Sequence, residues 1–260
     1  YYNNYLYFAT NFDISRYGPL DGTPAMVHGV WRGSTLGTQT SLRNTTYPSI
    51  RGSGVMPSHI LHVHLDNKLY VADYDSASTT AATRGRGLIH YIRTTYGSAE
   101  GDTNDSSTYN ALDLPIGFRP TAIESYGEDL VIAAIQSTDT VTDQGNAALF
   151  FWDTVSSSFY KQIFLDEPIV SALKVVNGIL YVFAGKLAAT NTAGNGYSVY
   201  QYLGGSSFKE IMTFEEGWPP LAGAVDANGD RVVWGSCVTN PANAGVVWAY
   251  GSKNGAIPPA

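Results

Sequence analysis

The sequence predicts an all-β fold built from repeated sheet modules, and three observations support this prediction. A short apolar strand occurs five times, each time directly after a polar or glycine-bearing turn. The starts of the five copies are separated by 63, 61, 50 and 52 residues, a spacing typical of repeated sheet modules. The composition, with 27 Gly and 18 Tyr among 260 residues, is typical of short strands joined by tight turns. The strand copies are residues 5–10, 68–73, 129–134, 179–184 and 231–236.

Each strand copy belongs to a longer module with four strands in a fixed order. The clearest module, 168–218, reads as two strands around the turn Asn177-Gly178, a polar loop and two further strands. Asn-Gly favours the positive backbone dihedrals of a tight hairpin. The module before it, 119–167, has the same order, and a Ser-Ser-Phe triplet precedes the fourth strand in both. The sequence therefore predicts four-stranded antiparallel sheets.

The remaining chain fits the same division less completely. We divide it into the modules 1–57, 58–118, 119–167, 168–218 and 219–260, which together form a single domain or a fragment of one. The opening module lacks its first strand, and the strand pattern of the closing module becomes weak around its fourth strand. We therefore expect sheets that are incomplete at both ends, with additional chain beyond one or both of them.

The repeated four-strand order resembles a β-propeller, and the resemblance covers nearly the whole chain. It implies at least four or five blades. Trp152-Asp153 is a solitary WD pair and Gly204-Gly205 is the only double glycine, so neither the WD40 nor the kelch signature is present. The resemblance thus identifies no propeller family. A β-sandwich is the structural alternative, and the repeated four-strand order argues against it.

Composition and charge exclude some classes of partner. With 15 Lys and Arg against 22 Asp and Glu, the net charge is −7, and no long basic block is present to neutralise phosphates. We therefore expect no nucleic-acid partner. No apolar run of about 18 residues is present, so we expect no membrane insertion. Cys237 is the only cysteine, which excludes an internal disulfide.

The low charge content and the abundance of Tyr, Ser, Thr and Asn resemble extracellular and virion proteins, such as phage tail proteins. This resemblance implies an extracellular or virion-surface location. Asn44 and Asn104 each begin an N-glycosylation acceptor pattern. Two such matches are expected by chance in a chain rich in Asn and Thr.

Three histidines are the candidate metal ligands. His62 and His64 are two residues apart on an expected strand, so both side chains face the same side of the sheet. Imidazoles placed in this way could converge on one metal ion, and His90 on a later strand could add a third ligand. No carboxylate is clearly placed beside them, and we therefore favour ordinary hydrogen-bonded histidines over a metal site. We predict no cofactor.

Two acidic pairs could in principle donate and accept protons in glycoside cleavage. They are Asp166 with Glu167 and Glu215 with Glu216, each just before a proline at corresponding ends of two modules. An active site would use each carboxylate in one unique role. The repetition therefore favours a structural loop, and we predict no catalytic residue.

Other suggestive residues have simpler structural interpretations. The alternating oxygen ligands of Asp226, Asn228 and Asp230 are better explained by a hairpin turn than by a calcium loop, which needs further ligands. The glycines of 84–87 lack the strand-to-helix setting of a phosphate site. Aromatic pairs recur in the third strand of two modules, which favours packing over ligand binding. These pairs are Tyr200 with Tyr202 and Trp248 with Tyr250.

Two functions from different classes follow. The first, which we favour, is a noncatalytic propeller that binds an assembly protein or a surface glycan through variable loops, because binding residues commonly lie on loops held by a rigid scaffold. The second is a secreted carbohydrate-active enzyme, a glycoside hydrolase or a lyase. That enzyme requires two carboxylates, or a histidine and metal centre, to converge at one site.

Overall fold

The computed structural model describes the strands of the chain together with their shorter turns. The described residues are 1–2, 4–9, 13–32, 60–75, 86–92, 112–136, 146–185, 197–214, 223–225, 229–236 and 246–251. No helix in these ranges is long and apolar enough to cross a membrane.

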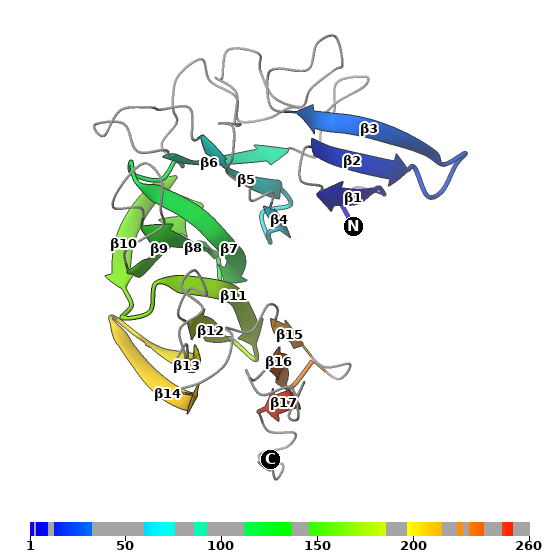
Figure 1. Ribbon diagram of the computed structural model, residues 1–260. Coiled ribbons are helices and arrows are strands. Elements are labelled where there is room, and N and C mark those ends of the chain that lie inside the picture. The colour runs from blue at the N-terminus through cyan, green and yellow to red at the C-terminus, as the bar shows by residue number, and fades with distance from the viewer. Residues whose placement is uncertain are drawn as a thin grey trace, which may run out of the picture. The chain divides into compact units, whose positions relative to one another are not determined.

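The described strands form five separate antiparallel sheets (Figure 1). Two of them have four strands in the order of the sequence, β7-β8-β9-β10 and β11-β12-β13-β14. The other three each have three described strands, also in sequence order. The two four-stranded sheets confirm the expected four-strand meander. The presence of five described sheets contradicts a sandwich of two sheets. The strands are β1 (Leu6–Ala9), β2 (Asp13–Gly18), β3 (Ala25–Arg32), β4 (Ile60–Val63), β5 (Leu69–Asp75), β6 (Arg86–Ile92), β7 (Phe118–Tyr126), β8 (Asp129–Gln136), β9 (Ala147–Asp153), β10 (Ser158–Phe164), β11 (Ile169–Val176), β12 (Ile179–Gly185), β13 (Tyr197–Gly204), β14 (Ser207–Phe214), β15 (Gly223–Val225), β16 (Val232–Ser236) and β17 (Val246–Tyr250).

The hairpin between β11 and β12 shows why the local sequence gives this sheet. Asn177 and Gly178 both have positive φ, 51° and 75°, and Val176 pairs with Ile179 across the turn. Asn and Gly tolerate this conformation far better than other residues. The Asn-Gly pair therefore fixes the register that places Leu180 and Val182 in the core.

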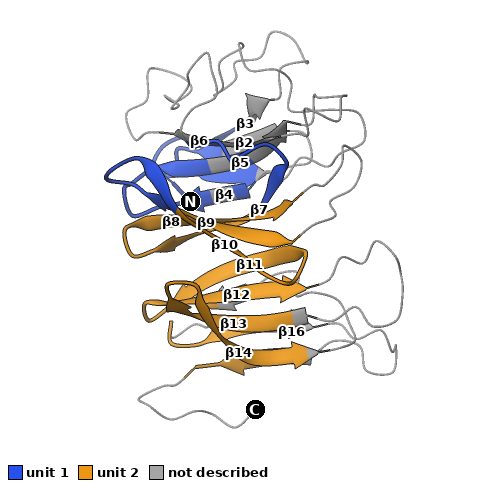
Figure 2. Ribbon diagram, turned by 90° about the vertical axis from the view of Figure 1, so that its left-hand side faces the viewer, with its two compact units in different colours: residues 1–120, 137–143, 152–160 blue, residues 121–136, 144–151, 161–260 orange. Residues whose placement is uncertain are grey.

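The chain divides into two compact units, coloured separately in Figure 2. Unit 1 consists of Tyr1–Pro120, Ser137–Asp143 and Trp152–Tyr160, and unit 2 of Thr121–Gln136, Gln144–Phe151 and Lys161–Ala260. In unit 1, the buried Tyr2 ties the N-terminal segment to the turn between β4 and β5, because its hydroxyl donates to the carbonyl of Asn67 at 3.0 Å.

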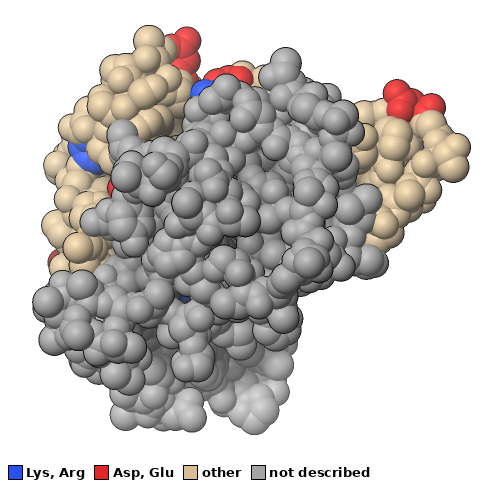
Figure 3. All heavy atoms as spheres, turned by 90° about the horizontal axis from the view of Figure 1, so that it is seen from above, with Lys and Arg blue, Asp and Glu red and all other residues tan. Residues whose placement is uncertain are grey.

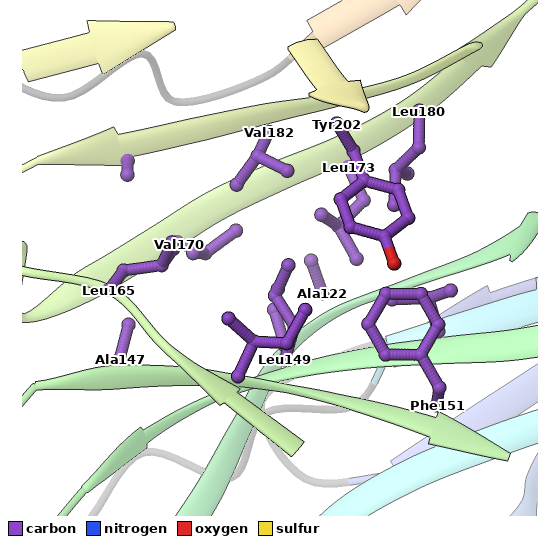
Figure 4. Close-up of a cluster of buried hydrophobic side chains, with 14 residues drawn as sticks. Ala122, Ala147, Leu149, Phe151, Leu165, Val170, Leu173, Leu180, Val182 and Tyr202 are labelled. Atoms are coloured by element: carbon purple, nitrogen blue, oxygen red, sulfur yellow. The ribbon is translucent and has the colours of Figure 1, made fainter. Parts of the chain in front are cut away.

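The largest core of unit 2 is formed by apolar side chains from β7 to β10 and from β11 to β13 (Figure 4). Phe151, Leu149 and Val182 are fully buried there, and Tyr202 is 4% exposed. Burying a side chain of this size stabilises a fold by about 1.5–3 kcal/mol. A second core in the same unit joins β11, β12 and β13 to β16, with Phe183 and Trp234 at its centre.

Candidate functional site

The first two candidate histidines lie close together at the end of β4. The ring centroids of His62 and His64 are 6.3 Å apart, and the His64 ring packs edge-on against Tyr70 at 5.9 Å. His64 is 3% exposed, and its backbone closes the turn to β5 by accepting from Asn67 N and donating to the carbonyl of Lys68, both at 3.0 Å. His64 therefore occupies a packed hairpin position.

The third candidate, His90, pairs in a different register row. The backbone of His62 pairs with Tyr70, whereas His90 pairs with Val71, the neighbouring residue of β5. No group of three His, Cys, Asp or Glu residues within the described ranges could hold a metal ion. The three histidines therefore stay weak candidates for metal ligands, and ordinary hydrogen-bonded histidines stay the favoured interpretation.

The acidic pair at the start of β11 contains one exposed and one half-buried residue. Asp166 is exposed, whereas Glu167 is half-buried and accepts a hydrogen bond at Oε1 from the Tyr200 hydroxyl. The Glu167 carbonyl accepts from Ala147 N at 2.8 Å. Its Oε2 is buried without a hydrogen-bond partner. Glu167 thus links the start of β9 to β13, which is a structural arrangement. The second pair, Glu215 and Glu216, lies outside the described residues.

The buried Tyr2 and the half-buried Tyr200 make the fold sensitive to alkaline pH. Burial, followed by the hydrogen bond to Glu167, raises the pKa of Tyr200 to about 12. Burial, and to a smaller extent the electrostatic repulsion from Tyr7 and Asp66, raises the pKa of Tyr2 to about 12. In the unfolded chain both hydroxyls titrate near pH 10. A pKa that is higher in the folded state favours folding below pH 10, and this contribution disappears as the pH rises through 12.

We therefore expect the free energy of unfolding to fall between pH 10 and pH 12. Urea unfolding at several pH values, with tyrosinate absorbance followed in parallel, measures this loss. Because Tyr200→Phe removes one titrating group, this variant should lose less stability over the same interval than the wild type does. A free energy of unfolding that stays constant from pH 9 to pH 12 would contradict this expectation.

The third-strand aromatics of unit 2 are packing residues. The Tyr202 ring lies 5.4 Å from Phe151, 5.7 Å from Tyr126 and 5.4 Å from Phe208. Tyr250 packs edge-on against Tyr181 at 6.1 Å. These contacts agree with the packing interpretation of the recurring aromatics. A ring enclosed in this way has little surface left to stack on a ligand.

Sequence reasoning missed Lys161 of β10. Its ammonium donates to the Tyr202 hydroxyl at 2.6 Å and lies 4.3 Å from the centre of the Phe151 ring. The Tyr202 hydroxyl in turn donates to the Gly205 carbonyl at 3.0 Å. A cation over an aromatic face is attracted by the ring quadrupole. The arrangement therefore fixes β10 against β13. The only signal in the sequence was a lysine within an otherwise uncharged strand.

Of the remaining candidates, Gly87 lies within the part of the chain that the structure describes. Gly87 of the Arg-Gly stretch is buried, and a Cβ atom there would lie 2.8 Å from Leu114 and 2.9 Å from Pro120. Close packing therefore accounts for this glycine. On the face shown in Figure 3, the described Lys and Arg side chains do not gather into a broad basic patch. The following candidates lie outside the described residues: Asn44, Arg84, Asn104, Asp226, Asn228 and Cys237.

Comparison with known proteins identifies the fold but no family. No protein-family profile matches the chain, and no curated protein matches it. An α-L-arabinofuranosidase from Lactobacillus brevis is similar in structure, with a TM-score of 0.50 and 13% identity over 99% of this chain and 90% of that one. A putative 6-phosphogluconolactonase from Bacteroides uniformis has a TM-score of 0.51 and 14% identity, over 95% of this chain and 67% of that one.

A third similar structure is the β-propeller domain of the Trilobed protease from Pyrococcus furiosus, which has an open velcro topology. Its TM-score is 0.49 and its identity 10%; the match covers 97% of this chain and 66% of that one, so this chain spans about two thirds of the protease chain. At such identities, structural likeness shows the fold alone. The chain is an all-β propeller with four-stranded antiparallel blades, and it belongs to no identified propeller family.

Proposed function

We propose that this propeller is a noncatalytic scaffold, extracellular or on a virion surface, that binds a protein or a glycan through its long connectors. The observation that carries the proposal is how the connectors are distributed between the two ends of each four-stranded sheet. Consecutive antiparallel strands place alternate connectors at opposite ends of the sheet.

In the sheet β7-β8-β9-β10, the short turns 127–128 and 154–157 lie at one end, and the long connector 137–146 leaves the other. The sheet β11-β12-β13-β14 repeats this division, with short turns at 177–178 and 205–206 and the long connector 186–196 between β12 and β13. Two sheets thus place their variable segments at the equivalent end. A rigid scaffold that carries variable loops at one end is a common arrangement for binding.

The sequence of these connectors suits hydrogen bonding. The residues 137–146 and 186–196 contain Ser, Thr, Asn, Gln and Gly, and no aromatic residue. Hydroxyl and amide side chains supply both donors and acceptors. Such a surface is suited to a polar protein partner or to the hydroxyls of a glycan.

Loop exchange tests the proposal. We would replace 137–146 and 186–196 by Gly/Ser linkers of equal length and probe the intact chain on an array of surface glycans and purified appendage proteins. We expect the wild type to bind at least one probe and the exchanged variant to lose at least tenfold in affinity. Extending the turn 205–206 by a Gly-Ser pair is the matched control, and it should leave binding unchanged.

Catalysis would overturn the proposal. If the wild type cleaved a polysaccharide and Glu167→Gln abolished that turnover, the chain would be a carbohydrate-active enzyme. Failure of the wild type to bind any probe on the array would also count against the proposed role.

A further inference from the structure

The sheet β11-β12-β13-β14 shows what the two faces of a sheet in this chain contact. Along β12, Leu180 and Val182 belong to the core shared with the preceding sheet, β7-β8-β9-β10. Phe183, next to Val182, belongs to the core shared with β16 of the following sheet. Successive residues of a strand point to opposite faces of its sheet. We call the face toward the preceding sheet the backward face and the face toward the following sheet the forward face.

The forward face of the sheet β15-β16-β17 is apolar and exposed. Trp234 of β16 points backward, into the core with Phe183. Its neighbour Val233 therefore points forward, together with Ala249, its pairing partner in β17. Val247, two residues before Ala249, lies on the same face and is 76% exposed. We call Val233, Val247 and Ala249 the forward patch; all three are uncharged.

The preceding sheet shows what covers such a position. The repeat aligns Phe183 of β12 with Gly235 of β16. Val199 pairs with Phe183, and Val247 pairs with Gly235, so the two valines are equivalent. Val199 is fully buried in the core that the forward face of its sheet shares with β16. The forward patch therefore corresponds to a surface that, one sheet earlier, is covered by the backward face of another sheet.

The sheet β1-β2-β3 has the complementary surface, an exposed backward face. The repeat aligns Phe8 of β1 with Val182 of β12. Val182 is fully buried, whereas Phe8 is 45% exposed. Leu6 lies two residues before Phe8, and its pairing partner Tyr17 in β2 shares the same face. We call Leu6, Phe8 and Tyr17 the backward patch; these residues are also uncharged.

We propose that the forward patch of one copy of this chain binds the backward patch of a second copy. The contact repeats the packing that already joins β12 to β16, in which a forward face meets a backward face. Val247 of one copy and Phe8 of the other are the most exposed apolar side chains of the two patches, and their burial would remove apolar surface from water. Because neither patch carries a charge, no ionic repulsion opposes the contact.

The contact joins two different surfaces and is therefore heterologous. Each copy keeps one unoccupied patch after the first contact, so association continues into a ring or an open chain of copies. A symmetric dimer through two forward patches is less favoured, because the cores of unit 2 pair a forward face with a backward face. Patches of a few residues are smaller than a standard interface, and we expect a roughly micromolar dissociation constant.

Sedimentation velocity of the intact chain tests the proposal at concentrations from about 1 to 200 μM, the range in which weak interfaces become populated. We expect the mean mass of the wild type to rise with concentration beyond that of a dimer. Val247→Glu and Phe8→Glu each place a charge in one patch, and each variant alone should associate at least tenfold more weakly. Leu203→Glu, at a 58% exposed position of β13 outside both patches, is the matched control and should associate like the wild type.

Mixing the two variants identifies the surfaces that meet. Val247→Glu keeps the backward patch and Phe8→Glu keeps the forward patch, so their equimolar mixture should form a dimer and nothing larger. The proposal is overturned if the wild type stays monomeric over the whole range, or if either variant associates like the wild type. It is also overturned if the mixture stays monomeric at concentrations where the wild type associates.

Milder variants guard against misfolding. Val247→Ser and Phe8→Ser add no charge and should weaken association severalfold with an unchanged melting temperature. Because neither patch includes a connector, exchange of 137–146 and 186–196 should leave association unchanged. The inference and the proposed function can therefore fail separately.

Discussion

Replacing Phe183 by alanine should lower the free energy of unfolding by about 3–5 kcal/mol, the usual cost of removing a buried aromatic ring. Phe183 of β12 is fully buried, and its ring centroid lies 5.6 Å from that of Trp234 in β16. The substitution would leave a cavity between two sheets of unit 2, and the backbones of both sheets are held by their own hydrogen bonds. Little collapse into the cavity is therefore expected. Urea unfolding followed by tryptophan fluorescence measures the loss.

The control for this prediction is an exposed phenylalanine. Phe8 of β1 is 45% exposed, so Phe8→Ala removes less buried surface and should cost well under half as much. Equal losses for Phe8→Ala and Phe183→Ala would show that the Phe183 ring is not buried against Trp234 of β16.

Tyr202 is the second position where we expect a large effect. Tyr202→Ala removes a ring that contacts Phe151, Tyr126 and Phe208, and should cost about 3–5 kcal/mol, as for other buried aromatic residues. Tyr202→Phe keeps the ring and removes only the hydroxyl that joins Lys161 to the Gly205 carbonyl. We expect this smaller change to cost about 1–3 kcal/mol, because the lysine ammonium loses a hydrogen-bond acceptor. Chemical unfolding of both variants separates the contribution of the ring from that of the hydroxyl.

A double-mutant cycle isolates the contact between Lys161 and Tyr202. Lys161→Met retains the apolar part of the side chain, and its combination with Tyr202→Phe should give a coupling energy of about 0.5–3 kcal/mol, as groups in direct contact do. Additive losses would mean that the ammonium and the hydroxyl do not interact in solution.

The sequence was sufficient to predict the strands and the tight turns, because both are encoded locally. Asn177-Gly178 sets a two-residue hairpin whatever lies around it, and the alternation of apolar residues shows which face of a strand is buried. The repeated Ser-Ser-Phe triplet similarly predicts the fourth strands of two sheets. The all-β propeller fold follows from these local signals and their order.

Contacts between sheets could not be predicted in the same way, because they join segments that are distant in sequence. Nothing near Glu167 indicates that the Tyr200 hydroxyl donates to it, and nothing near Lys161 indicates Tyr202. The register of β5 with β6, which assigns His90 to the row of Val71, depends equally on how distant strands pair.

The central claim is that the strands provide stability while the long connectors provide binding. The most direct measurement is the free energy of unfolding of the variant in which Gly/Ser linkers replace 137–146 and 186–196. Even a doubling of the length of a flexible loop changes the free energy of unfolding by only about 0.6 kcal/mol. The Gly/Ser linkers keep the loop length constant, so their effect on stability should be small. We therefore predict a stability within about 1 kcal/mol of the wild type, the range expected for changes outside a core, together with the loss of partner binding. A loss as large as that of Phe183→Ala, or unchanged binding, would contradict the division of roles.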